Sequence, residues 1–229
     1  MATASRCVFI TGGTGYLGSR LIPRLLDRGY QVRALARPGS EQKLAKGCEI
    51  VVGNALDHTT YADRVGPCDT FVQLAGVAHP SPAKGAEFRT IDLPAGLAGI
   101  SAACKARVQH FVYVSVAHPA PVMKAYIEVR QQCEAAIGAH GLKATILRPW
   151  YVLGPGHRWP YLLVPFYGLL GVLPATRAGA QRLGLVTLEQ MVTALEAAVE
   201  DPATETRIWG VPEIRKRRAR STVSRSNAA

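Results

Sequence analysis

Cysteine motifs and a secretion signal are both missing from this chain. Its cysteines are few and scattered, and no Cys-x-x-Cys pair occurs, so no zinc or other metal site is predicted. The opening residues, Met-Ala-Thr-Ala-Ser-Arg, contain no apolar segment of the kind that directs secretion. An odd number of cysteines without such a signal predicts reduced thiols and a cytoplasmic protein. The five are Cys7, Cys48, Cys68, Cys104 and Cys133.

Apolar runs long enough to span a bilayer were not found either. The stretch Tyr161–Leu173 is thirteen residues long and holds one proline and two glycines, so it is too short to cross a membrane as a helix. The favoured interpretation is a helix packed over the substrate side of the fold. Peripheral contact with a membrane or a hydrophobic partner is the alternative.

Acidic residues are absent from the last fifteen positions, and this explains much of the net charge of +11. Six basic side chains in that segment contribute +6, which leaves 11 − 6 = +5 for the rest of the chain: Arg215, Lys216, Arg217, Arg218, Arg220 and Arg225. Residues 213–229 are therefore predicted to form a disordered, solvated basic tail. No specific nucleic-acid partner is expected.

Glycine, in contrast, is plentiful and patterned. Gly12, Gly15 and Gly18 are spaced three apart, after the apolar run Cys7–Thr11 and before a helical pattern. Glycines in such a turn let the backbone approach a pyrophosphate, and the following helix N-terminus favours its negative charge. Since the strand and the helix flank the turn as the motif requires, a dinucleotide site is predicted. Its residues are Thr11, Gly12, Gly13, Thr14, Gly15, Tyr16, Leu17 and Gly18.

Strand and helix patterns alternate along the chain, which predicts an α/β fold with a doubly wound, parallel, Rossmann-like sheet and helices on both faces. Residues 1–149 are expected to form the dinucleotide-binding domain and 150–212 a small substrate-side segment. Predicted strands are Cys7–Thr11, Gln31–Ala36, Glu49–Val52, Asp69–Leu74, Gln109–Val114, Ala144–Leu147 and Arg207–Trp209. Predicted helices are the segment ending at Gly29, then Phe88–Arg107, Lys124–Ala139 and Leu188–Glu200.

Several motifs together resemble the extended or atypical short-chain dehydrogenase/reductase superfamily, in particular its NAD-dependent epimerase/dehydratase-like branch. The resemblance spans residues 6–212 and rests on the glycine turn, Gly53–Asp57, Leu74–Gly76, Tyr113–Ser115 and Leu147–Gly154. It implies a nicotinamide cofactor, a small-molecule substrate and a homodimer of the kind common among relatives. By the same resemblance, further cofactor contacts come from Asn54, Ala55, Leu56, Leu74, Ala75, Gly76 and Pro149.

Arg37 bears on which nicotinamide cofactor is bound. An acid at the end of the second strand normally accepts hydrogen bonds from the ribose hydroxyl of NAD, but here that position is Arg37. An arginine would instead pair with the phosphate of NADP. Arg33 is expected on the same side of an extended strand. NADP(H) is therefore favoured over NAD(H).

Catalysis in the resembled superfamily uses a Tyr-x-x-x-Lys pair and a serine or threonine after the preceding strand. Here Ser115 ends the strand, and Tyr126 is followed four residues later by Arg130 rather than lysine. A neighbouring cation favours the ionised phenol, so Tyr126 is the candidate proton donor or acceptor, with Arg130 and Ser115 in support. Arginine and lysine are not interchangeable at a site of fixed geometry. His118 is a further acid–base candidate, and Asp92 is interpreted as structural.

Two classes of function remain open. One is an NADP-dependent oxidoreductase or epimerase that moves a hydride to or from a small or apolar carbonyl or hydroxyl compound. The other is a catalytically weak NADP(H)-binding regulator or assembly protein, which the replacement of lysine would permit. The short segment after Trp150 argues against a full-size sugar epimerase.

Overall fold

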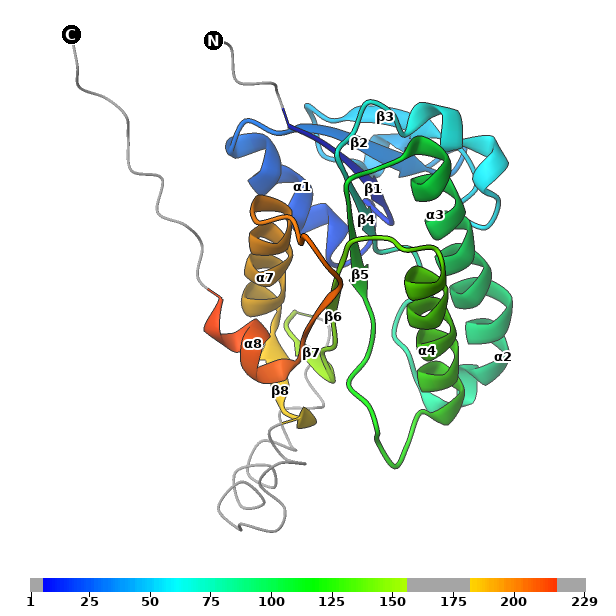
Figure 1. The fold of residues 1–229 in the computed structure, drawn as a ribbon, viewed down its shortest axis with the longest axis vertical. Helices are drawn as coiled ribbons and strands as arrows, with labels where there is room; N and C mark the ends of the chain where they lie inside the picture. The colour runs from blue at the N-terminus through cyan, green and yellow to red at the C-terminus, as the bar shows by residue number, and fades with distance from the viewer. Residues whose placement is uncertain (1–5, 156–181, 218–229) are drawn as a thin grey trace, which may run out of the picture.

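The computed structural model describes residues 6–155 and 182–217, and the topology of its main sheet follows the predicted alternation (Figure 1). Seven strands form this sheet: β1 (Cys7–Thr11), β2 (Gln31–Ala36), β3 (Glu49–Val52), β4 (Thr70–Gln73), β5 (His110–Val114), β6 (Ala144–Leu147) and β9 (Arg207–Trp209). Their order is β3-β2-β1-β4-β5-β6-β9, and every pairing is parallel. The strand order reverses between β1 and β4, where doubly wound sheets bind their ligands.

Helices cover both faces of the sheet. In Figure 1, α1 and α7 lie on one side and α2, α3 and α4 on the other. The helical segments are α1 (Gly18–Asp27), α2 (Gly85–Glu87), α3 (Leu93–Ala106), α4 (Lys124–Ala139), α7 (Leu188–Glu200) and α8 (Val211–Lys216), with a π-helical turn at Phe88–Asp92 and short 3₁₀ turns at Glu41–Lys43, His58–Thr60, Ala62–Arg64 and Pro82–Lys84.

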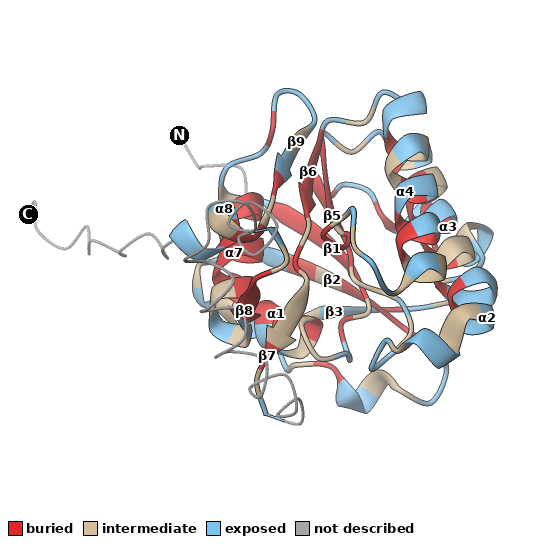
Figure 2. Ribbon diagram, turned by 90° about the horizontal axis from the view of Figure 1, so that it is seen from below, coloured by how far each residue is buried: buried red, intermediate tan, exposed pale blue. Residues whose placement is uncertain are grey.

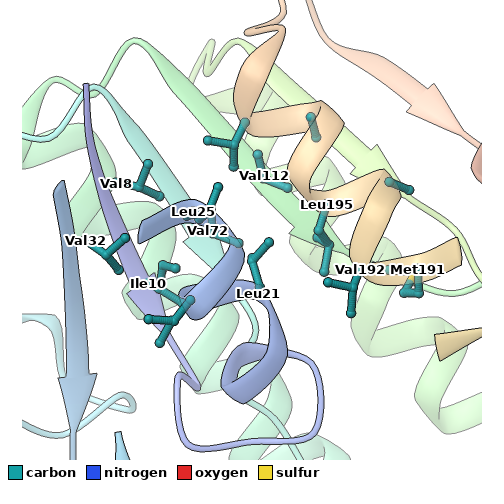
Figure 3. Packing of buried hydrophobic residues seen from close by; sticks show 14 of the residues in the cluster. Val8, Ile10, Leu21, Leu25, Val32, Val72, Val112, Met191, Val192 and Leu195 are labelled. Carbon is teal, nitrogen blue, oxygen red and sulfur yellow. The ribbon is translucent and has the colours of Figure 1, made fainter. Parts of the chain in front are cut away.

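A hydrophobic core lies on each face of the sheet. On one face, aliphatic side chains of the central strands, such as Ile10 of β1, pack against Leu21 of α1 and Leu195 of α7 (Figure 3). On the other face, Phe9 and Phe71 pack with ring centroids 5.2 Å apart, and Phe71 and Phe111 with centroids 5.4 Å apart. The central strands β1, β4, β5 and β6 are consequently buried, while the outward sides of the helices are exposed (Figure 2).

The predicted elements are confirmed to within a residue or two, and Pro94 shows why the expected helix 88–107 survives a proline. Pro94 stands in the first turn of α3, where a helix needs no amide donor from it. The preceding residues Phe88–Asp92 adopt the π-helical turn, so the segment is helical in two parts.

Several short elements were not predicted, three of them in the part of the chain after β6. The strands β7 (Tyr151–Leu153) and β8 (Leu185–Thr187) pair in parallel as a second, two-stranded sheet. The helix α8 is the third, and its presence corrects the expectation that the disordered tail begins at residue 213. Arg215 within it donates from Nε to the carbonyl of Leu185 at 2.9 Å. The rest of the expected tail, 218–229, lies outside the described residues.

The expectation of five reduced cysteines is wrong for two of them. Cys7 in β1 and Cys68 in the turn before β4 are joined as a disulfide. Cys48, Cys104 and Cys133 are free thiols, as expected. Sequence spacing could not reveal the pair, because the two cysteines are 61 residues apart and meet only when β1 and β4 align.

Within the ranges that the structure describes, no helix is long and apolar enough to cross a membrane. The apolar stretch Tyr161–Leu173 lies outside those ranges, so both interpretations of it remain predictions.

Candidate functional site

The glycine turn connects β1 to α1 at the point where the strand order reverses. Gly12 has a φ of +69°, and a Cβ there would stand 2.6 Å from the carbonyl carbon of Leu74. A Cβ on Gly18 would stand 2.7 Å from the Cα of Gly13 and closer still to the carbonyl oxygen of Gly12. The turn therefore has no room for side chains at these two positions, which is the requirement the motif places on them.

Thr11 and Gln73 hold the ends of β1 and β4 together. The Thr11 hydroxyl donates to Oε1 of Gln73 at 2.7 Å and accepts from the backbone N–H groups of Leu74 and Ala75 at 3.2 and 3.3 Å. The Gln73 amide donates in turn to the carbonyl of Ala95 at 3.1 Å. Both side chains are buried. The predicted Leu74–Gly76 motif is thus brought against the glycine turn, whereas the role of Gln73 was missed.

The first turn of α1 has no side-chain cap. It also holds no acidic side chain, so the positive end of the helix dipole faces the glycine turn without a carboxylate to neutralise it, which suits an anion such as a pyrophosphate. The N–H groups of Ser19 and Leu21 already donate to the carbonyls of Gly15 and Leu17, each at 3.0 Å. The Gly15 N–H is used within the turn, where it donates to the Gly12 carbonyl at 3.0 Å.

The loop after β3 is held by its own polar side chains. Asn54 Oδ1 accepts from the Leu56 N–H at 3.1 Å, and the Thr60 hydroxyl oxygen accepts from the Asn54 N–H at 2.9 Å. Asp57 caps the following 3₁₀ turn, and this hydrogen bonding lowers the pKa of its carboxyl. Leu56 is left 40% exposed beside the carboxyl end of β3. This is the edge at which the adenine side of a dinucleotide is expected.

Arg37 and Arg33 differ in a way that the sequence did not predict. Arg37 follows β2 and is exposed, and among the residues described here its guanidinium has no hydrogen-bond or ion-pair partner. Arg33 is committed elsewhere: its Nε donates to Glu49 at 2.8 Å and its Nη1 to the carbonyl of Arg64 at 3.0 Å. Arg33 is therefore already engaged by protein partners, unlike Arg37.

Tyr126 and Arg130 are brought together on α4, but not as a phenol–cation hydrogen bond. The Arg130 guanidinium lies over the Tyr126 ring, 4.8 Å from its centroid, and the ring also packs on Phe88 at 4.8 Å. Tyr126 is half-buried. Its hydroxyl has no hydrogen-bond partner in the part of the chain that is described.

Arg130 is buried and belongs to a polar cluster under the Leu74–Gly76 loop. It forms an ion pair with the fully buried carboxylate of Asp92 and donates to the Tyr113 hydroxyl at 3.2 Å and to the Val114 carbonyl at 3.1 Å. Asp92 also accepts from the Val77 N–H at 3.0 Å. The cluster joins the π-helical turn before α3, α4 and β5 to Val77 after the Leu74–Gly76 loop, which agrees with the interpretation of Asp92 as structural.

Burial sets the electrostatics of this cluster. Desolvation raises the pKa of Asp92, and the positive charge of Arg130 opposes that rise. Desolvation likewise raises the pKa of the Tyr113 phenol, which therefore stays protonated. These groups hold the fold around the site, and none of them offers a freely titrating acid or base.

Ser115 lies in a second polar cluster, separate from Tyr126. It is buried, and its hydroxyl donates to Oε1 of Glu134 at 2.5 Å. Arg148 donates from Nε to the same carboxylate at 3.0 Å. His118 Nε2 stands 3.7 Å from Glu134 Oε2, too far for a hydrogen bond. Serine, tyrosine and cation are thus not assembled as the resemblance implied.

Two cavities border the carboxyl edge of the sheets. One, of about 520 Å³, lies between α1 and α7 and is lined by Pro23, Leu153, Leu188 and Val192 among others. The other, of about 320 Å³, is lined by residues that follow β5, β6 and β9, including His118. The second is the nearer to the polar clusters, since His118 belongs to both.

Comparison with known proteins agrees with the cofactor geometry. A family model described as NAD(P)H-binding matches residues 12–158. The chain is 27% identical over 205 residues to a ceramide reductase of Caulobacter vibrioides, which covers 88% of this chain and 64% of that protein. It is also 27% identical over 168 residues to a farnesyl-dihydroquinoline-oxide ketoreductase of Stigmatella aurantiaca, covering 64% of this chain and 50% of the relative. The chain thus spans between half and two thirds of these relatives.

Solved structures share the fold. WbmH of Bordetella bronchiseptica, crystallised with NAD+, superposes with a TM-score of 0.67 at 22% identity, covering 90% of this chain and 76% of that one. UDP-glucose 4-epimerase of Thermus thermophilus, in complex with NAD, gives a TM-score of 0.65 at 17% identity, covering 91% and 81%. At these identities the likeness concerns the architecture alone.

Proposed function

This chain belongs to the NAD(P)H-binding family, within the short-chain dehydrogenase/reductase superfamily, and on that premise we propose that it is an NADP(H)-dependent reductase of small or apolar carbonyl compounds. The observation that carries the proposal is the glycine turn, closed against Leu74 and followed by an uncapped helix N-terminus. Glycines without room for a side chain, followed by the positive end of a helix with no acid in its first turn, fit a pyrophosphate. When bound, the nicotinamide supplies the hydride.

Preference for NADP(H) is supported by Arg37. Its guanidinium is exposed and unpaired among the described residues, at the strand end where an acid would select NAD. A charge-assisted hydrogen bond contributes about 1.5–3 kcal/mol. We therefore expect Arg37→Ala to weaken NADPH binding by about tenfold or more and to leave NADH binding unchanged, as measured by titration of cofactor fluorescence.

Arg64→Ala is the matched control, since Arg64 is an exposed arginine on the surface beside β3 whose Glu49 contact is 3.9 Å long. It should leave both affinities unchanged. A wild-type preference for NADPH of less than about threefold, or an Arg37→Ala variant that binds as the wild type does, would contradict the assignment.

For the proton, Tyr126 is the proposed donor. Reduction of a carbonyl places a hydride on carbon and a proton on oxygen, and the half-buried Tyr126 hydroxyl is uncommitted within the described chain. Arg130 acts as a positioning residue: it lies under the ring at 4.8 Å while its charge is neutralised by Asp92. Ser115 donates to Glu134, so its expected role toward substrate is not part of the proposal.

A weakly catalytic cofactor-binding protein is the second candidate. It is favoured by one observation, the sequestration of Arg130 by Asp92, Tyr113 and Val114, because this cation does not contact the Tyr126 hydroxyl. A partial relative, 32% identical over 113 residues, is a photosystem II assembly factor of Trieres chinensis.

Turnover distinguishes the two candidates. NADPH oxidation is followed across a panel of aldehydes and ketones, with wild type and Tyr126→Phe. Turnover that falls at least tenfold in Tyr126→Phe, with NADPH binding retained, supports the reductase. Stoichiometric NADPH binding without any turnover supports the second candidate, and unchanged turnover in Tyr126→Phe removes Tyr126 from the mechanism.

A further inference from the structure

The cavity of about 320 Å³ is formed where β5, β6 and β9 end, on the same edge of the sheet as the glycine turn. Its lining combines three nitrogen-bearing side chains with an apolar wall. The nitrogen-bearing side chains are His118, Arg148 and Arg182, and the apolar wall consists of Ala117, Ile208, Val211 and Pro212. A volume of this size is sufficient for a small organic molecule.

Arg148 lines this cavity and has one edge of its guanidinium unused by the described residues. Glu134 occupies the Nε–Nη2 edge of the guanidinium, with Nε at 3.0 Å from Oε1. Across the described part of the chain, Nη1 has no acceptor. Glu134 also holds the guanidinium plane in place, since it is itself fixed by Ser115. A planar, pre-oriented guanidinium with a free edge matches a planar oxyanion.

His118 and Arg182 complete the polar side of the cavity. His118 Nε2 is buried and makes no hydrogen bond. Burial lowers the pKa of His118, and the charges of Arg148 and Arg182 lower it further, against an opposite effect of Glu134. Both arginines are therefore within electrostatic reach of the imidazole. Arg182 is exposed and forms no ion pair with any described residue.

The acidic residue of the cavity lining, Glu213, already accepts a hydrogen bond from the backbone. Glu213 Oε2 accepts from the backbone N–H of Gly210 at 3.0 Å, at the start of α8. Its charge still lies on the cavity wall, where the charge of Arg182 opposes it, while the charge of Arg148 is shared with Glu134. Opposite them, Ile208 is 48% exposed, so an apolar body would cover it favourably.

We propose that this cavity binds a small carboxylic acid with an apolar body, and that an oxo acid of this kind is the substrate of the proposed reductase. Arg148 and Arg182 would hold the carboxylate, His118 would donate to it or to the adjacent carbonyl oxygen, and Ile208 and Val211 would contact the apolar part. The reduction itself rests on the proposed function above; carboxylate binding does not.

A matched pair of probes tests the cavity without turnover. Ketoisocaproate and methyl isobutyl ketone share the same branched body and ketone and differ in the carboxylate. Each is titrated calorimetrically into wild-type protein, with and without saturating NADPH. We expect ketoisocaproate to bind at least tenfold more tightly than the ketone, since a charged hydrogen bond contributes about 1.5–3 kcal/mol.

Variants locate the binding. Arg182→Gln is expected to lower the affinity for ketoisocaproate about fivefold, because an exposed charge contributes about 1 kcal/mol to binding. The affinity for the ketone should not change. His118→Gln is also expected to lower the affinity for ketoisocaproate. Arg89→Gln is the control: this exposed arginine pairs with Glu128, away from the cavity. Circular dichroism establishes that each variant is folded.

Equal affinity for acid and ketone, no binding of the acid, or acid binding that survives both Arg182→Gln and His118→Gln would each overturn the proposal. Inorganic phosphate that displaces ketoisocaproate at a lower concentration than acetate does would also overturn it, in favour of a phosphate site. Failure of NADPH to bind would count against the proposed function alone, because the acid–ketone comparison is made without cofactor too.

Discussion

At the scale of single residues, Arg130 shows how a charge can be buried without being available for chemistry. Its partners Asp92, Tyr113 and Val114 come from two elements, the π-helical turn and β5, and leave only the ring contact with Tyr126 on the site side. The sequence could predict that Tyr126 and Arg130 share a helical face. It could not predict that Asp92 neutralises the cation, since the pair is separated by 38 residues and forms only when α3 and α4 pack together.

Removal of Asp92 is expected to be costly. Asp92→Ala leaves the Arg130 charge buried and unpaired, which lowers the free energy of unfolding by on the order of 3–5 kcal/mol. Urea unfolding measures the change. Asp63→Ala is the control, because Asp63 is 78% exposed and pairs with Lys105 on the surface; it should cost less than about 1 kcal/mol. Equal effects of the two substitutions would contradict the buried-pair description.

His110 predicts a pH dependence of stability. Burial lowers its pKa to about 4, with Arg207 adding to the effect and Asp201 opposing it. The unfolded chain therefore takes up a proton on this residue near pH 6.5, whereas the folded chain does so only near pH 4. The contribution of neutral His110 to the free energy of unfolding is fully present above about pH 6.5. It is lost as the pH drops toward 4, by about 3 kcal/mol in total.

Urea midpoints at pH 7, 5.5 and 4.5 for wild type and His110→Gln measure this effect. The two proteins should differ most at pH 7, where only the wild type carries the benefit, and converge as the pH falls. His140→Gln, at an exposed position after α4, should follow the wild type at each pH. A His110→Gln variant whose deficit stays constant over this range would contradict the assignment.

At the scale of elements, α7 is fastened to α1 by ion pairs of unequal burial. Glu196 is only 3% exposed and pairs with Arg28 and, at 3.5 Å, with Arg24, whereas Glu189 on the same helix is 73% exposed and pairs with Arg24. Glu196→Gln should lower the free energy of unfolding by on the order of 3 kcal/mol, and Glu189→Gln by less than about 1 kcal/mol.

Amide hydrogen exchange localises that change. Protection should fall along α7 in Glu196→Gln and remain at the wild-type level in Glu189→Gln. Loss of protection of similar size in both variants would show that the helix does not depend on the buried pair.

Which elements the sequence predicts depends on their length and periodicity. The helices Lys124–Ala139 and Leu188–Glu200 have the predicted bounds, because their apolar spacing extends over several turns. The strands β7 and β8 have three residues each, and α8 has six. Segments this short carry no readable period, and β7 and β8 are strands only because each supplies the other's hydrogen-bond partners.

At the scale of the whole molecule, cofactor binding should appear as thermal stability. A ligand at about one hundred times its Kd adds roughly 2.7 kcal/mol to the folded state, which in a chain of this size raises Tm by about 5–10 °C. Thermal unfolding with NADPH should show this shift, and NADH at the same concentration a smaller one. The Gly18→Ala variant should show none, because a Cβ there collides with the backbone of the glycine turn.

Gly138→Ala is the control for that substitution. Gly138 lies on α4 with open space around its Cα, so alanine fits there and adds helix propensity. This variant should keep the full NADPH shift. A Gly18→Ala protein that is stabilised by NADPH as the wild type is would contradict the proposed cofactor site.

The doubly wound architecture could be predicted because alternation of strands and helices constrains the topology. The side-chain constellation could not. Ser115 was expected near Tyr126, yet its hydroxyl donates to Glu134. The end of a strand predicts where the backbone of Ser115 lies, but it does not predict which neighbour accepts its hydrogen bond. Cofactor binding follows from backbone shape, which glycine spacing reveals, whereas reactivity depends on contacts between distant residues.

The last strand of the main sheet has a consequence for synthesis of the chain. β6 pairs on its outer side only with β9, and Thr145 meets Arg207, 62 residues later. A ribosome that adds about 5–20 residues per second takes roughly 3–12 s to make that interval. Throughout this time the β6 edge is open and the side chains of Trp209 and Ile214 have yet to be made. The nascent protein therefore passes through a stage with an unprotected sheet edge, during which a chaperone at the ribosome exit has a defined strand to shield.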